Sequence, residues 1–143
     1  MSDELRDRLE IGEILARYAS SLDERDWPRL ATCFTPDAVG DYGMGDPLEG
    51  YAAIEALCRG TLEPLDASQH LVGSIEIDLD GDTATSRCAL QAQHTRRGLP
   101  DGENYLIGGT YRDRWVRTDT GWRIAHRQLR MVWSEGNPAV VAR

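Results

Sequence analysis

The sequence lacks the motifs of common metal-dependent, disulfide-bonded and serine-hydrolase proteins. No Cys-x-x-Cys, His-Glu-x-x-His or Gly-x-Ser-x-Gly pattern occurs, and the glycines near residues 43–45 and 108–109 lack the strand-to-helix context of phosphate loops. There are only three cysteines, an odd number without close pairing. They argue against a disulfide framework or a zinc site, and we expect Cys33, Cys58 and Cys88 to be buried free thiols. We therefore expect no metal and no cofactor.

Positive charge and long apolar runs are also scarce. The 16 basic residues face 24 acidic ones, giving a formal net charge of −8, which disfavours nucleic acid or an anionic membrane as a partner. No apolar run approaches the roughly 20 residues needed to span a bilayer, and residues 1–4 begin acidic, unlike a signal peptide. A soluble, cytoplasmic protein is expected, and its 143 residues fit one domain, 1–143.

The first half of the chain has helical patterns. From Asp3 to Asp23, apolar residues recur at steps of three and four, which predicts a helix with one buried stripe. Asp26 as an N-cap and Pro28 in the first turn indicate a short second helix running to about residue 34. After a brief strand near 38–42 and a glycine-rich loop, the composition of residues 51–62 favours a third helix.

The second half of the chain has the patterns of strands. Ile75, Ile77 and Leu79 alternate with acidic residues, and Asp80-Gly81-Asp82 supplies a reversal. Further strands are predicted over 83–95, 103–117 and 122–133, with a loose tail after about residue 135. Helices followed by a four-strand antiparallel meander define an α+β fold, in which a strongly curved sheet could wrap around the first helix.

An aspartate and a histidine are the best candidates for chemistry. Asp23 ends the first helix, where a carboxylate is costly to bury without a partner and is disfavoured by the helix dipole. His70 follows an acidic, proline-containing segment and opens a strand, so its ring can face the concave side if Leu71 faces the other. A carboxylate that orients an imidazole makes it a general base. The alternatives are a solvent-facing Asp23 and an ordinary buried His70.

Three further side chains have positions suited to a site. His94 shares its parity with Cys88, Leu90 and Ala92, which indicates a second inward-facing histidine. Tyr18, one turn before Leu22, can offer a phenol to a substrate oxygen, although an ordinary core tyrosine is equally consistent with its position. Tyr42 has the same two interpretations.

Arg127 is the fourth such candidate, and its orientation is open. It shares parity with Arg123, Ala125 and Leu129, and the competing set is Trp122, Ile124 and His126. An exposed cation is the usual outcome for arginine. Inside a cavity, the guanidinium would instead bind a leaving oxyanion or halide.

Several of these residues together resemble the SnoaL-like branch of the nuclear transport factor 2-like superfamily, over nearly the whole chain. The resemblance is carried by residues 14–18, 22–27, 33–38, 68–70, 106–111 and 121–124. It implies a cone-shaped, cystatin-like α+β barrel, in which a highly curved antiparallel or mixed sheet wraps around N-terminal helices and encloses a pocket.

Within that branch the chain is similar to scytalone dehydratase, hexachlorocyclohexane dehydrochlorinase and bile-acid 7α-dehydratase, which are cofactor-free lyases with an Asp-His pair. Asp23 and His70 match the pair. The resemblance places Tyr18, Tyr42, His94 and Arg127 at substrate-binding positions and favours the inward parity for Arg127. At two positions the chain departs from scytalone dehydratase, since Gly109 and Tyr111 stand where that enzyme has Ser and Asn.

We therefore expect a cofactor-independent lyase of the dehydratase type that acts on a small, mostly apolar cyclic or polyketide-like substrate. His70 is the expected base and Asp23 the residue that orients it. An isomerase or polyketide cyclase with the same dyad, and a non-catalytic small-ligand-binding domain, are the alternatives. The resemblance also implies a homo-oligomer, a trimer or dimer built on the outer face of the sheet.

Overall fold

Three helices form where the sequence predicts them. The computed structural model describes residues 2–142 and contains α1 (Asp3–Glu24), α2 (Trp27–Ala31) and α3 (Tyr51–Leu62). The predicted N-cap Asp26 accepts a hydrogen bond from the Arg29 amide at 3.1 Å. α2 ends earlier than predicted because the chain turns after Ala31 and enters the sheet at Phe34. The carbonyl of Cys33, just before the strand, accepts from the Ile124 amide at 2.8 Å. No helix among residues 2–142 is long and apolar enough to cross a bilayer.

The sheet has six strands in the order β2-β1-β6-β5-β4-β3. The predicted antiparallel meander is confirmed as β3 to β6, and two strands join it at the β6 edge. β1 runs parallel to β6, so its partner is about 90 residues away in the chain and local patterning does not reveal it. The strands are β1 (Phe34–Asp41), β2 (Leu48–Glu49), β3 (Ala67–Asp80), β4 (Thr83–Thr95), β5 (Asn104–Thr118) and β6 (Gly121–Gly136).

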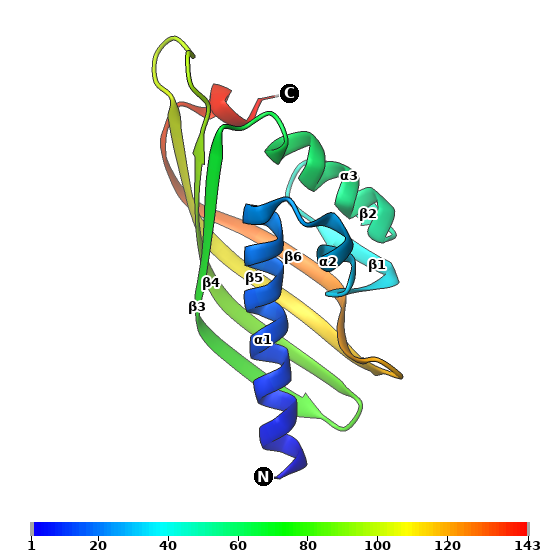
Figure 1. Ribbon diagram of the computed structural model, residues 1–143. Helices are drawn as coiled ribbons and strands as arrows, with labels where there is room; N and C mark the ends of the chain where they lie inside the picture. Colours follow the sequence, from blue (N-terminus) through cyan, green and yellow to red (C-terminus); the bar gives the residue numbers. More distant parts are fainter. Residues whose placement is uncertain (1, 143) are drawn as a thin grey trace.

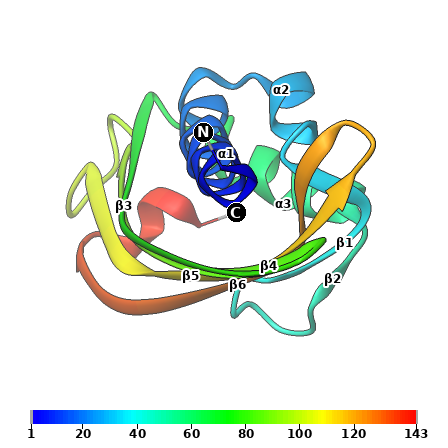
Figure 2. The ribbon, with the colours of Figure 1, turned by 90° about the horizontal axis from the view of Figure 1, so that it is seen from below.

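The sheet is strongly curved but not closed, and all the helices lie on its concave side (Figures 1 and 2). α1 runs through the concavity and buries Ile11, Leu15 and Leu22 against the strands. Residues of the predicted stripe nearer the N-terminus, Leu5 and Leu9, are instead about half exposed. The fold is thus α+β, as predicted, with its core between α1 and the inner face of the sheet.

β3 is longer than its alternating segment suggests, and it contains a bulge. The pairing with β4 shifts between Gly73 and Glu76, and Ser74 lies there with a φ of 49°. Ile77 and Leu79 face the core, but Ile75 lies in the bulge and is exposed, so the predicted three-residue apolar face is wrong at this position.

The C-terminal segment is folded, which corrects the prediction of a loose tail. Pro138–Val141 form a 3-10 helix, η1, capped by the side chain of Asn137. Val140 is only 1% exposed, and the Asn137 amide donates to the carbonyl of Asn104 at 2.8 Å. The sequence pattern missed this segment because one buried valine after a glycine leaves no periodicity to detect.

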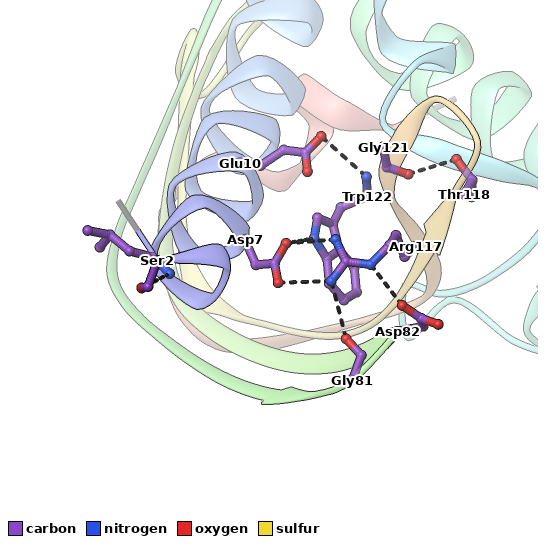
Figure 3. A network of polar contacts seen from close by, with 10 residues as sticks. Ser2, Asp7, Glu10, Gly81, Asp82, Arg117, Thr118, Gly121 and Trp122 are labelled. Atoms are coloured by element: carbon purple, nitrogen blue, oxygen red, sulfur yellow. Dashed lines mark hydrogen bonds and ion pairs between the residues drawn. The ribbon is translucent and has the colours of Figure 1, made fainter.

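The lower half of α1 is tied to the sheet by a buried carboxylate (Figure 3). Asp7 accepts two hydrogen bonds from Arg117, at 2.8 and 2.9 Å, and a third from Trp122 Nε1 at 2.9 Å. Arg117 also donates to Asp82 in the turn between β3 and β4 at 2.9 Å. The Arg117 guanidinium and the Trp122 indole hold the pKa of Asp7 below its ordinary value of 3.8.

This network predicts a specific loss of stability on acidification. Because the pKa of Asp7 is lower in the folded state, its contribution to folding stability is complete above pH 3.8. That contribution is lost as the pH falls through the lowered pKa.

Replacing Asp7 with Ala leaves the buried Trp122 N–H unpaired and should destabilise the fold by about 1–3 kcal/mol. Urea unfolding at neutral pH measures this loss.

Asp119→Ala is the matched control, because Asp119 lies exposed in the turn between β5 and β6. It should change the free energy of unfolding by no more than about 0.5 kcal/mol. Equal effects of the two substitutions would contradict the role assigned to Asp7.

Candidate functional site

The concave side of the sheet contains a cavity of about 700 Å³. It is large enough for a small organic molecule. Its wall is mostly apolar, with polar groups contributed by a few side chains. Its lining residues include Tyr18, Tyr42, His70, His94, Tyr105 and Tyr111.

Asp23 and His70 meet at this cavity. His70 Nδ1 lies 2.7 Å from Asp23 Oδ1, and the backbone amide of His70 donates to the same carboxylate at 2.9 and 3.1 Å. The His70 side chain is only 7% exposed, and Leu71 points to the opposite face. With Nδ1–H donating to the carboxylate, Nε2 carries the free lone pair of the neutral ring.

Arg25 links the two elements that carry this pair. It ends α1 in the left-handed conformation, with a φ of 58°, and its guanidinium donates to the carbonyl of Leu22 at 2.7 Å. The same Nη1 donates to Ser68 Oγ on β3 at 2.8 Å. Arg25 therefore ties the end of α1 to β3. Its own position is two residues from Asp23, and its partner Ser68 is two residues from His70.

His94 lies beside His70, with 5.9 Å between the ring centres and the planes nearly perpendicular. As predicted from its parity, it faces inward and is buried. Its Nδ1 lies 3.0 Å from the carbonyl of Tyr105 and donates to it, because a carbonyl only accepts. Burial lowers the pKa of His94, so this second imidazole remains neutral near pH 7.

Tyr18 and Tyr42 form a pair of phenols on the same cavity wall. Their hydroxyl oxygens are 3.2 Å apart, although one residue lies on α1 and the other follows β1. Burial raises the pKa of both phenols well above its ordinary value, so both are protonated donors at neutral pH.

Arg127 has the inward orientation that the resemblance favours, but it lies behind the cavity wall. Its guanidinium is fully buried and makes two hydrogen bonds to Asp113, at 2.7 and 2.8 Å. It stacks on the rings of Tyr18 and Tyr111, with Cζ 4.1 and 3.9 Å from their centres. The two rings therefore separate the cation from the cavity.

Sequence reasoning did not select Arg25, Tyr111 or Asp113. A signal existed for Asp113, because it shares its parity on β5 with Tyr111 and Trp115, and an acid on an apolar face needs a partner. No comparable signal marked Arg25, whose role depends on where β3 passes the end of α1.

The site is built from acid-base and hydrogen-bonding side chains. Among residues 2–142, no cluster of three or more His, Cys, Asp or Glu side chains is arranged to hold a metal ion. Cys33, Cys58 and Cys88 are buried free cysteines, as predicted.

Comparisons with known proteins agree with the fold. The SnoaL-like domain model matches residues 3–128, and the chain belongs to this family. An uncharacterized protein of Mycobacterium tuberculosis is 36% identical over 126 residues, covering 87% of this chain and 84% of that protein. The terrestric acid biosynthesis cluster protein E of Penicillium crustosum is 30% identical, and the match covers 95% of this chain and 90% of that protein. Scytalone dehydratase of Colletotrichum orbiculare is 26% identical, and the match covers 90% of this chain and 75% of that protein.

Solved structures show the same architecture. A protein from Kribbella flavida is similar with a TM-score of 0.87 and 26% identity, covering 97% of this chain and 99% of its own. A type 2 hexachlorocyclohexane dehydrochlorinase shares the fold, with a TM-score of 0.83 at 19% identity. The match covers 94% of this chain and 91% of that one. The curved sheet around α1 is thus the scaffold of a nuclear transport factor 2-like protein.

The buried pair of Arg127 and Asp113 predicts an asymmetric response to mutation. Asp113→Leu leaves the guanidinium charged and unpaired in the core and should cost about 3–5 kcal/mol of folding stability. The double variant Asp113→Leu/Arg127→Met removes both charges and should recover most of that loss. Urea unfolding of the two variants tests this, and a double variant no more stable than the single one would contradict it.

Proposed function

We propose that the chain is a cofactor-independent lyase that eliminates water from a small, mostly apolar cyclic substrate. The supporting observation is the 2.7 Å contact between Asp23 and His70 at the wall of a largely apolar cavity. The similarity to a scytalone dehydratase over most of the chain supports the same class of reaction.

His70 is the proposed general base. Its Nε2 takes a proton from the carbon next to a carbonyl, while Asp23 holds Nδ1–H and stabilises the imidazolium that forms. Tyr18 and Tyr42 donate hydrogen bonds to the carbonyl oxygen, on which negative charge develops. The bond from the β-carbon to its hydroxyl then breaks, the imidazolium returns the proton to the departing oxygen, and water and a C=C bond are formed.

The arrangement of the two histidines supports separate roles for them. His70 has a carboxylate partner that stabilises its protonated form, whereas His94 has only a carbonyl partner and a lowered pKa. His94 therefore serves as a neutral acceptor for a substrate hydroxyl rather than as a second base.

An isomerase or a polyketide cyclase with the same dyad is the second candidate. Both reactions begin with the same removal of a proton from carbon, and the site supplies a base and hydrogen-bond donors for an enolate in either case. The mass of the product distinguishes them, because only elimination loses one water.

The outer face of the sheet is the proposed contact between copies of the chain in a homo-oligomer. No helix described in residues 2–142 covers this face (Figure 2). Leu71 and Trp133 are 60% and 41% exposed and lie in one row across the sheet, joined by Gln91 and Gly108. An exposed apolar row on an uncovered sheet favours burial against a second copy.

Oligomer formation predicts a mass in solution above that of one chain. In the double variant Leu71→Lys/Trp133→Lys, like charges repel each other at the contact. The mass measured by light scattering after gel filtration should therefore fall towards that of the monomer. A matched pair of substitutions at the exposed Glu4 and Glu24 should leave the mass unchanged. A wild-type protein that is monomeric at high concentration would contradict the proposed contact.

Substitution of the dyad tests the proposed reaction. In a screen of cyclic β-hydroxy ketones, His70→Ala and Asp23→Asn should each lower kcat/KM by about a hundredfold or more, because proton transfer loses its base or the orientation of that base. Glu24→Gln is the matched control, since it removes the same charge from the next, exposed residue. Unchanged turnover in both dyad variants would refute the mechanism.

Hydrogen exchange distinguishes catalysis from binding alone. In D₂O, a ketone that binds the wild-type protein should take up deuterium at its acidic carbon, and His70→Ala should abolish the uptake. A ligand that stabilises the protein against heat but never exchanges would favour the non-catalytic alternative.

A further inference from the structure

The outer face of the sheet carries a second pocket, which the proposed reaction does not use. The pocket has a volume of about 340 Å³, within the range of small-molecule sites, and extends across β3 to β6. Its lining includes Arg87, Arg112, Arg114 and His126. We propose that this pocket binds a small, multiply charged oxyanion, such as pyrophosphate or the phosphoryl end of a soluble phosphate ester.

Strand pairing brings the three arginines together. Arg87 and Arg112 are Cα partners on β4 and β5, and Arg114 is the next residue of β5 on the same face. Arg114 is in turn paired with His126 on β6. Side chains directly opposite each other on one face have Cβ atoms about 5 Å apart, and like charges in this position destabilise a sheet. A bound anion would remove the repulsion between Arg87 and Arg112.

The part of the chain that the structure describes, residues 2–142, supplies no partner for these charges. No side-chain hydrogen bond or ion pair is described for Arg87, Arg112 or Arg114. Asp113 lies between two of them in the sequence, but its carboxylate is on the inner face and makes two hydrogen bonds to Arg127. The three guanidinium groups are therefore free to donate to a ligand in the pocket.

The charges of the pocket and of the whole chain define the ligand. Guanidinium groups match the oxygens of a phosphoryl group, to which arginine donates paired hydrogen bonds. An anion with a single charge would leave most of the positive charge uncompensated. The formal net charge of −8 repels an anionic membrane or a nucleic acid, because the charge of either extends beyond the pocket. The fitting ligand is therefore small, soluble and multiply charged.

Two acidic side chains restrict where the anion lies. Glu76 and Asp78 line the pocket from β3, where Glu76 is the Cα partner of Arg87. Their negative charge opposes an anion near β3, so the favoured position is over β5, beside Arg112 and Arg114. Removal of the two acids should therefore strengthen binding, which gives the proposal a test in the direction of gain.

The pocket is separate from the cavity that contains the dyad. The cavity lies on the concave side of the sheet, and Gln128 is the one described residue that lines both. Binding of an oxyanion on the outer face is thus independent of the reaction proposed for His70. Either can fail in its own experiment without affecting the other.

Calorimetric titration with inorganic pyrophosphate tests the site without any turnover. At constant ionic strength, the wild-type protein should bind pyrophosphate saturably and bind acetate at least about tenfold more weakly. Pyrophosphate should also raise the midpoint of urea unfolding, because a ligand that binds only the folded chain stabilises it. Heats that do not saturate and do not differ between the two anions would overturn the proposal.

Substitutions in the pocket locate the ligand. Arg112→Gln and Arg114→Gln should each weaken pyrophosphate binding by about tenfold, whereas Glu76→Gln/Asp78→Asn should strengthen it severalfold. Arg6→Gln is the matched control, because it removes the same charge from an exposed position of α1, on the concave side of the sheet (Figure 2). Equal losses in all three arginine variants would reduce the effect to net charge and contradict the assigned site.

Folding stability distinguishes a ligand site from a structural role of the arginines. Without added anion, Arg112→Gln should unfold at the same urea concentration as the wild type or at a higher one, because it removes the repulsion with Arg87. Added pyrophosphate should then stabilise the wild type more than the variant. A variant that is less stable before any anion is added would show that Arg112 pairs within the chain, and would overturn the proposal.

Two further measurements separate the proposed ligand from other partners. Vesicles containing phosphatidylserine should not retain the protein on sedimentation, and retention would replace the soluble ligand with a bilayer surface. Arg112→Gln should keep the wild-type mass in light scattering. A fall in mass would assign Arg112 to the acids of a second copy at the proposed contact, and would contradict the ligand site.

Discussion

The structure depends on two aspartates of α1, Asp7 buried and Asp23 partly buried, for which the sheet supplies partners. Asp7 is neutralised by Arg117 and accepts from the Trp122 indole, and 16 residues later Asp23 accepts from the ring and backbone of His70. An unpaired carboxylate in either place would be costly, so α1 has one favourable position along the concave face. The same requirement that holds the helix in place creates the oriented imidazole.

Two groups of polar side chains lie at or behind the cavity wall. One is the Asp23 carboxylate with the imidazoles of His70 and His94. The other is the phenols of Tyr18 and Tyr111, whose rings lie against the buried Arg127 guanidinium. The two are joined by α1, which carries both Asp23 and Tyr18. Such a division suits reactions that begin by removing a proton from carbon, because the charge that leaves one atom must be stabilised at another.

Much of the candidate site was predictable because alternation along a strand fixes which side chains share a face. The inward positions of His70 and His94 followed from the exposure expected for Leu71 and from the apolar residues preceding His94. Arg127 was ambiguous on the same grounds, since both faces of its segment carry polar and apolar residues, and the resemblance favoured the correct one. Its covering by Tyr18 and Tyr111 was not predictable, because it depends on the packing of α1 against β5.

The sequence alone determined the local elements: the amphipathic α1, the cap of α2, α3 and the antiparallel meander, each set by contacts between residues close in the chain. The tertiary structure decided everything that depends on distant pairing. It placed β1 parallel to β6, moved Ile75 into a bulge and folded η1 onto the sheet. It also joined Asp113 to Arg127 and Asp23 to His70. Periodicity indicates which way a side chain faces, but only the closed packing of helix and sheet determines which charge it meets there.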